Sequence, residues 1–330
     1  MLSRREQCLC LPSAWFIIHT ERIIIMKKVL SIVLSILLVF SLTGVAFAAE
    51  NEPVLPFENS SFFEVGDYTL HYRTYPAETQ EKGQIMLLHG FGLSSASFEG
   101  LADEYAGNGY KVVTVDLPDF GYSSRETKKT DFVDREDLVY ALMENLGGKW
   151  ILGGHSMGGG IAINVATEYP ESVNALFLFA PQSTAAIGKP LNQLVSSSIV
   201  TAIFESLISV GSRIPCVMRM LVAQSFSDVD YAKQYDVSKI ANPLQIKGTG
   251  RGIAIMASHA KATDLERFST LSVPVVIVTA ENDKIAAADN LNAILAAAPD
   301  VAKTVTLSKG GHMMMEYAPE TVCEATLAGI

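Results

Sequence analysis

The chain has 330 residues, of which 49% are apolar and 18% charged, and its formal net charge at pH 7 is −10. Such a composition supports a sizeable core and excludes a largely disordered chain. Residues 1–49 hold five Lys or Arg and two Asp or Glu, so the remainder carries a net charge of −13. This acidity argues against nucleic acid as a partner, because phosphate contacts need clustered Lys and Arg.

The four cysteines are Cys8, Cys10, Cys216 and Cys323. None of them forms a C-x-x-C pair, so the sequence predicts neither a zinc site nor a disulfide scaffold. The sequence alone leaves a bridge between Cys216 and Cys323 open.

A basic pair, an apolar run and a small-residue motif follow one another near the N-terminus. Lys27-Lys28 precedes an almost unbroken apolar run over residues 29–40, and Ala46-Phe47-Ala48 follows. This is the pattern of a secretory signal peptide, which we expect to occupy residues 26–49 and to be cleaved near Ala48 or Ala49. The alternative is an uncleaved anchor that associates with a membrane, because about 20 apolar residues span a bilayer.

Either interpretation predicts an exported protein, secreted or held in the cell envelope. Residues 1–25 precede the signal pattern, and we interpret them as an extension upstream of the natural start at Met26.

Strand-like and helix-like segments alternate through most of the remaining chain, a pattern that predicts a parallel sheet covered on both faces. A turn at Gly66-Asp67 predicts a hairpin between the first two strands. The expected strands are 62–65, 68–75, 84–88, 111–115, 150–152, 175–180, 273–280 and 304–307. The expected helices are 94–107 (capped by Ser94 or Ser95), 131–146, 161–169, 289–298 and one from near Pro319.

The alternation stops near Pro181 and resumes at residue 273, and the interval is too long for a loop in a compact domain. We therefore predict a core of residues 50–181 and 273–330, with a mainly helical insert over residues 182–272. Residues 191–221 are rich in apolar side chains, which favours a lid or a lipophilic pocket.

Gly154-His155-Ser156-Met157-Gly158 fits the G-x-S-x-G pattern between an expected strand and an expected helix. Such a turn holds its serine in a sparsely populated backbone conformation, so that the hydroxyl projects above the sheet. Gly154 and Gly158 leave out side chains that would clash there. The motif by itself is a weak signal, since a glycine-rich turn without chemistry has the same pattern.

A serine hydroxyl needs a base, and the base needs an acidic partner that holds its tautomer. His89 and His312 are the histidines at strand ends, and we predict His312 as the base; the side chain of His155 is expected to diverge from the serine. Asp283 follows an expected strand at a carboxyl end, where sites in open α/β sheets lie. The order Ser156, Asp283, His312 matches the one expected with this turn, although Glu281 and Asp289 remain alternatives for the acid.

An oxyanion site needs two preorganised amides. We expect one from Met157, directly after the serine, and the other from Phe91. His89 and Gly90 shape the turn that carries Phe91, whose side chain is a candidate to line the pocket.

These motifs together resemble the α/β-hydrolase fold superfamily over about residues 62–330. The resemblance implies an eight-stranded, mostly parallel sheet, a cap inserted after the sixth strand, no cofactor and no metal. It also favours Asp283 over Glu281 and Asp289. Asp119 departs from the glycine common in relatives and is expected to add a charge near the entrance. The motifs are 89–92 (HGFG), 116–123 (DLPDFGYS), 154–159 (GHSMGG), Asp283, and Gly311-His312 with Glu316 and Pro319.

The sequence thus predicts a serine hydrolase of the carboxylesterase or lipase kind, which cleaves a small lipophilic ester through an acyl-enzyme. The alternatives on the same triad are a C–C bond hydrolase, a thioesterase and an aminopeptidase, because fold and triad do not separate these reactions. A receptor or binding protein with a vestigial triad is the alternative from another class.

Overall fold

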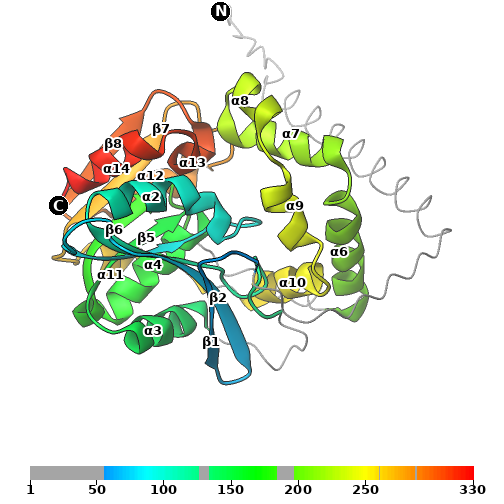
Figure 1. Ribbon diagram of the computed structural model, residues 1–330, viewed down its shortest axis with the longest axis horizontal. Helices are drawn as coiled ribbons and strands as arrows, with labels where there is room; N and C mark the ends of the chain where they lie inside the picture. The colour runs from blue at the N-terminus through cyan, green and yellow to red at the C-terminus, as the bar shows by residue number, and fades with distance from the viewer. Residues whose placement is uncertain (1–55, 126–133, 184–196, 260, 287) are drawn as a thin grey trace, which may run out of the picture. The chain divides into compact units, whose positions relative to one another are not determined.

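Eight strands form one sheet in the order β1-β2-β4-β3-β5-β6-β7-β8 (Figure 1). The structure is a computed structural model, and it describes residues 56–125, 134–183, 197–259, 261–286 and 288–330. β1 pairs antiparallel with β2, and β2 pairs antiparallel with β4, while all the other pairs are parallel. The predicted eight-stranded, mostly parallel sheet is confirmed. The strands are β1 (Ser60–Val65), β2 (Tyr68–Tyr75), β3 (Gly83–Leu88), β4 (Tyr110–Val115), β5 (Trp150–His155), β6 (Val173–Phe179), β7 (Val275–Ala280) and β8 (Ala302–Leu307).

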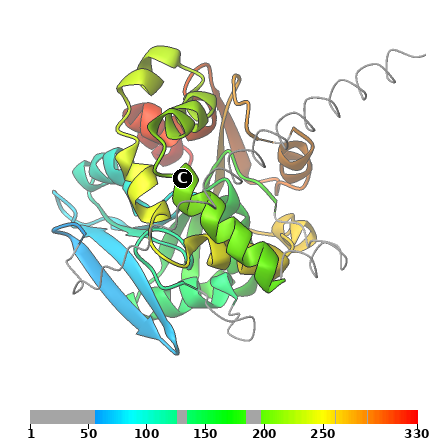
Figure 2. The ribbon, with the colours of Figure 1, turned by 90° about the vertical axis from the view of Figure 1, so that its right-hand side faces the viewer.

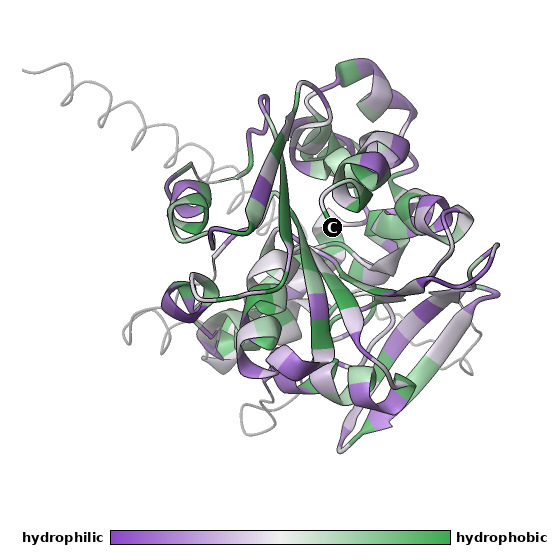
Figure 3. Ribbon diagram, turned by 90° about the vertical axis from the view of Figure 1, so that its left-hand side faces the viewer, coloured by the Kyte–Doolittle hydropathy of each residue, from purple (hydrophilic) through white to green (hydrophobic). Residues whose placement is uncertain are grey.

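Helices cover both faces of the sheet. Successive residues of β3 belong to different buried clusters, because side chains of a strand alternate between the two faces. Met86 belongs to the cluster that includes side chains of α3, α4, α11 and α12, and Leu87 belongs to the cluster that includes side chains of α2 and α14. The strands in the middle of the sheet are apolar along most of their length (Figure 3). These helices are α2 (Glu99–Gly107), α3 (Arg135–Leu146), α4 (Met157–Glu168), α11 (Leu265–Phe268), α12 (Ala288–Ala296) and α14 (Pro319–Leu327).

Most of the described part of the segment between β6 and β7 is helical. Five of its helices, α6 to α10, lie to one side of the sheet in Figure 1 and face the viewer in Figure 2, while α11 contributes to a buried cluster with side chains of the sheet. Val222 and Phe226 are buried in the same cluster as Met313 and Met314, so the insert packs on the core. The helices are α6 (Ser198–Gly211), α7 (Pro215–Phe226), α8 (Val229–Gln234), α9 (Ser238–Leu244) and α10 (Thr249–His259).

Two predicted helix starts differ from the observed ones. The helix after β3 begins as a 3-10 turn, η1 (Ser95–Phe98), and Ser94 makes no side-chain capping bond. Instead, the Ser95 amide donates to Asp116 Oδ1 at 2.6 Å, so a distant carboxylate caps this helix. The helix after β5 begins at Met157 rather than at residue 161, because close packing outweighs the low helix propensity of three glycines.

Several expectations fall on residues that the structure does not describe. The signal segment 26–49, the extension 1–25, Cys8 and Cys10 lie outside the described ranges, as do residues 131–133 of the helix expected over residues 131–146. Cys216 is exposed and Cys323 is buried, and both are free thiols, so the bridge left open by the sequence is absent.

Within the described ranges, no single helix is both long and apolar enough to cross a membrane. Only α6 and α7 taken together reach the required length and composition, and they bend by 91° where they meet.

Candidate active site

Ser156 lies between the end of β5 and the start of α4, with φ 51° and ψ −118°. A positive φ is rare for a residue with a side chain, and it stores strain that the surrounding structure must hold. The Ser156 amide donates to the Phe179 carbonyl at 2.9 Å, and the Ser156 carbonyl accepts from Gly159 at 2.9 Å and from Gln182 at 3.0 Å. These bonds fix the strained turn that the sequence predicts.

The glycines of the turn permit close contacts between backbone segments. A Cβ on Gly154 would lie 2.2 Å from the Gly158 carbonyl oxygen, and one on Gly158 would lie 2.3 Å from the Leu88 carbonyl oxygen. A Cβ on Gly90 would lie 2.6 Å from His155 Nδ1 and 3.0 Å from Ser156 Cβ. The loop after β3 therefore lies directly against the serine turn.

His312 and Asp283 are joined by a hydrogen bond in which Nδ1 donates to Oδ2 at 2.8 Å. Asp283 follows β7 by three residues, and its Oδ1 accepts from the amides of Ile285 at 2.8 Å and Ala286 at 2.9 Å. His312 belongs to a 3-10 turn, η3 (Gly311–Met313), and both side chains are 7% exposed.

The environment of Asp283 favours its ionised form. Burial opposes ionisation, but the hydrogen bond and charge of His312, with the two backbone amides, outweigh it and lower the pKa of Asp283. An ionised carboxylate only accepts hydrogen bonds, so it holds the proton of His312 on Nδ1. In a neutral imidazole, Nε2 is then the basic nitrogen.

His155 connects His312 to the serine turn. Its Nε2 donates to the His312 carbonyl oxygen at 2.8 Å, and the two rings are 4.7 Å apart between centroids. Burial, and then the charge of His312, lower the pKa of His155 well below its usual value, so it stays neutral. The sequence predicted only that the side chain of His155 diverges from Ser156; the contact of its ring with the backbone of His312 was not predicted. The structure thus brings Asp283 to His312 and places His312 against the residue before Ser156.

The loop that carries Phe91 is held by a buried histidine. His89 Nδ1 donates to the Gly90 carbonyl oxygen at 2.7 Å, and His89 Nε2 accepts from the Leu117 amide at 3.0 Å. Burial lowers the pKa of His89, in keeping with a neutral ring. In a trans peptide the carbonyl and the next amide point in opposite directions. The bond to Gly90 therefore fixes the direction of the Phe91 amide, whereas the Phe91 side chain is 55% exposed.

Comparisons with known proteins agree with this architecture. The family model described as alpha/beta hydrolase fold matches residues 84–319. The chain belongs to this family. The hydrolase fold is also shared with an esterase from Thermogutta terrifontis, with a TM-score of 0.64 and 18% identity, covering 82% of this chain and 97% of that one.

Relatives within the family carry different names. Lipase 3 of Moraxella sp. (strain TA144) is 25% identical over 252 residues, covering 71% of this chain and 73% of the lipase. The dihydrolipoyllysine-residue acetyltransferase component of the acetoin cleaving system of Pseudomonas putida is 26% identical over 253 residues. That match covers 74% of this chain and 62% of the length of the relative. Names at this level of identity do not define the substrate.

Asp119 occupies a position where the hydrolase fold commonly has glycine, and its φ of 74° accounts for that preference. Asp119 is fully buried and its Oδ2 lies 2.5 Å from Arg135 Nη2, so its charge is paired inside the protein rather than exposed to solvent. A Cβ on Gly252 of α10 would lie 1.9 Å from Asp119 Oδ1, so the insert covers this pair.

One further residue at the site was not recognised in the sequence. Asn282 Oδ1 accepts from the Gly311 amide at 3.2 Å, and the Asn282 carbonyl accepts from the Ser227 hydroxyl. Asn282 thereby joins the loop after β7 to η3 and to the end of α7. Its position beside Asp283 is the signal that could have identified it. Among the described residues, no cluster of His, Cys, Asp or Glu suits a metal ion.

Proposed function

We propose that this protein is a serine hydrolase that cleaves carboxylic esters of small lipophilic compounds through an acyl-enzyme at Ser156. The observation that carries the proposal is the Asp283–His312 hydrogen bond beside a strained serine turn. A nucleophile, a base and a carboxylate that orients the base are the parts that this reaction needs.

In the proposed reaction, His312 Nε2 takes the Ser156 proton as the hydroxyl oxygen attacks the ester carbonyl. The amides of Phe91 and Met157 stabilise the oxyanion, and the N-terminus of α4 adds its partial positive charge. His312 then protonates the leaving alcohol, and water releases the acid from Ser156 in the same way.

The insert supports a lipophilic substrate. Residues 198–226 contain two arginines and one glutamate, and Glu205 accepts hydrogen bonds from the amides of Gly248 and Arg251 within the insert. Helices with so few free charges favour an alkyl or acyl chain over a charged substrate. The lipase name of a relative supports the same substrate class. We also propose that the protein is exported by residues 26–49.

A series of p-nitrophenyl esters from acetate to palmitate, with and without a detergent interface, tests the proposal. Ser156→Ala should lower the turnover number by several orders of magnitude. The control is Ser269→Ala, at an exposed serine directly after α11, which should leave the turnover number unchanged. Undiminished turnover in Ser156→Ala would refute the proposal. Turnover that depends on Ser156 but is confined to thioesters, anilides or C–C substrates would replace the ester by one of those classes.

A further inference from the structure

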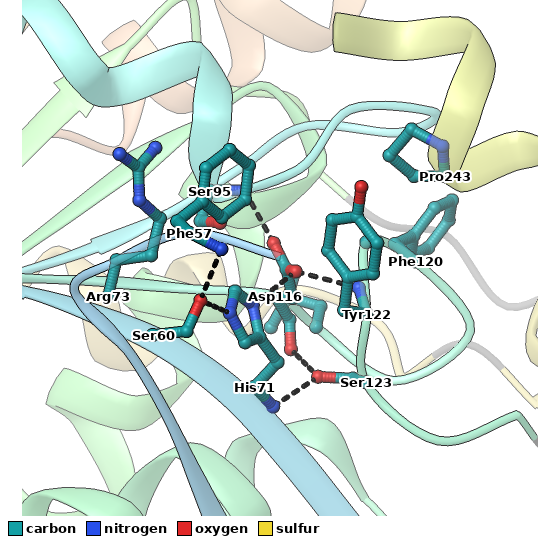
Figure 4. Close-up of polar contacts among 12 residues, drawn as sticks. Phe57, Ser60, His71, Arg73, Ser95, Asp116, Phe120, Tyr122, Ser123 and Pro243 are labelled. Atoms are coloured by element: carbon teal, nitrogen blue, oxygen red, sulfur yellow. Dashed lines mark hydrogen bonds and ion pairs between the residues drawn. The ribbon is translucent and has the colours of Figure 1, made fainter. Parts of the chain in front are cut away.

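A second serine, histidine and aspartate are joined by hydrogen bonds at the edge of the sheet (Figure 4). Ser60 begins the edge strand β1, and His71 lies on β2. The pairs Ser60–Arg73 and Phe62–His71 in the hairpin register place Ser60 and His71 diagonally on one face. By strand spacing alone, Ser60 on β1 lies about 19 Å from the Ser156 turn, while Asp116, at the end of β4, lies about 10 Å from it.

The distances within this cluster are those of a proton relay. Ser60 Oγ lies 2.7 Å from His71 Nε2, and His71 Nδ1 lies 2.7 Å from Asp116 Oδ2. A nucleophile within hydrogen-bond reach of a base that a third group orients is the signature of an activated hydroxyl.

The surroundings of Asp116 determine the direction of each bond. Asp116 accepts from the amides of Ser95 at 2.6 Å and Tyr122 at 2.8 Å. Burial opposes ionisation, but the hydrogen bond and charge of His71, together with the amide of Ser95, lower the pKa of Asp116. An ionised Asp116 needs a donor on His71 Nδ1, so in the neutral ring Nε2 accepts the proton of Ser60.

The base is more completely buried than the serine. His71 and Asp116 are fully buried, while Ser60 lies half-buried on an edge strand. The rings of Phe57, Phe62 and Tyr122 lie 6.2, 5.2 and 5.6 Å from the imidazole of His71. The Phe57 amide donates to Ser60 Oγ at 3.1 Å, which favours negative charge on that oxygen.

We propose that Ser60 is a second reactive serine, which His71 and Asp116 activate toward acyl and phosphonyl donors. With a fluorophosphonate, an Oγ–P bond forms, the P–F bond breaks, fluoride leaves with the bonding electrons, and the Ser60 proton passes to His71 Nε2 and then to water. Ser60 lies in an extended strand rather than at a helix N-terminus. The oxyanion that forms on the attacked donor therefore gains no stabilisation from a helix dipole. We therefore expect one slow covalent modification per chain and no turnover.

The test uses the full chain carrying Ser156→Ala, treated with a fluorophosphonate probe and analysed by peptide mass spectrometry. We expect the label on Ser60 to accumulate at least 100 times faster than any label on Ser61. Ser61 is the matched control, since it is the next residue of the same strand and its side chain points to the other face. Adding Ser60→Ala should abolish the label, and adding Ser61→Ala should leave it.

Equal rates at Ser60 and Ser61, or no label on Ser60, would overturn the proposal and leave the cluster a structural tie between the β1–β2 hairpin and the loop after β4. His71→Gln, checked by circular dichroism, should also abolish the label; if that variant does not fold, the ratio of the two serine rates decides. Because Ser156 is absent throughout, failure here is distinguishable from failure of the proposed esterase.

Discussion

Asp283 is the residue that orients the base in the proposed chemistry. It accepts two amide hydrogen bonds through Oδ1 and the His312 proton through Oδ2. Its lowered pKa means that the carboxylate persists through mildly acidic conditions. One charged side chain therefore fixes the tautomer of the base and compensates the imidazolium that forms during reaction.

Asp283→Asn should lower the turnover number for p-nitrophenyl acetate by roughly 10³- to 10⁴-fold, because an amide no longer enforces the Nδ1 tautomer. Glu281→Gln is the control, since Glu281 is an exposed acid two residues earlier in the same loop. Near-wild-type turnover in Asp283→Asn would show that another carboxylate orients the base.

Gly90→Ala should reduce the turnover number by roughly 10²-fold, because the new Cβ would collide with His155 and Ser156 and displace the Phe91 amide. The comparison is Gly83→Ala at the start of β3, where a Cβ would meet Tyr110 at an ordinary 3.7 Å. The turnover numbers of the two variants are compared by steady-state kinetics. Equal turnover numbers would mean that the loop after β3 does not contribute to the chemistry.

The residue types and their order along the chain predicted Ser156, Asp283 and His312 as the catalytic residues. The hydrogen bond between His312 and Asp283 shows that these two side chains meet. The sequence could not separate Asp283 from Glu281 and Asp289 without the resemblance, because all three follow the same strand. The contact between His155 and His312 was not predictable, since adjacency to a serine says nothing of a contact with a loop more than 150 residues later.

At the scale of elements, α13 (Met314–Tyr317) lies between η3 and α14 and carries a partly buried acid, Glu316. Burial raises the pKa of Glu316 to about 7, against the opposing effects of Lys239 and Tyr235. The Tyr231 hydroxyl also donates to the Glu316 carbonyl at 3.3 Å, so α8 rests on α13.

Glu316 should make the unfolding free energy depend on pH. The pKa of Glu316 is higher in the folded state than the ordinary value of 4.5, so the native state binds its proton more tightly than the unfolded chain does. The stabilisation that results is fully present below pH 4.5 and is lost as the pH rises through about 7. The loss should amount to roughly 2–3 kcal/mol between pH 4.5 and 8. Urea unfolding across this range measures it.

Glu316→Gln should flatten this part of the profile, while Glu320→Gln, at an exposed acid in the first turn of α14, should retain it. Identical pH profiles for wild type and Glu316→Gln would contradict the assignment.

The strands were predictable because apolar runs between turn residues are local signals, and each observed strand overlaps an expected one. The helices of the insert were predictable in kind but not in bounds. Apolar side chains occur throughout residues 191–221, so no periodicity marks where α6 ends and α7 begins.

For the whole molecule, the attachment of the insert to the core involves contacts that no local pattern reveals. Arg125 donates to the carbonyl oxygens of Phe120 at 3.0 Å and Gly121 at 2.7 Å in the core. It also donates to Thr249 Oγ1 at 2.8 Å and to the Pro243 carbonyl at 3.3 Å in the insert. One guanidinium therefore fixes the α9–α10 end of the insert.

Arg125→Ala should increase the rate of limited proteolysis within residues 197–259 by about tenfold, because several charge-assisted bonds are lost. Arg213→Ala, in which the lost bonds lead to Ser209 of the same insert, is the control. Protection equal to that of wild type in Arg125→Ala would show that apolar packing alone holds the insert.

The central claim is that His312 makes the hydroxyl of Ser156 reactive. The most direct measurement is the second-order rate of fluorophosphonate labelling at Ser156, read by peptide mass spectrometry, in wild type and His312→Ala. We predict fast labelling in the wild type and a rate at least 10³-fold lower in the variant. Equal rates in the two proteins, or a wild type that does not label at Ser156, would contradict the account.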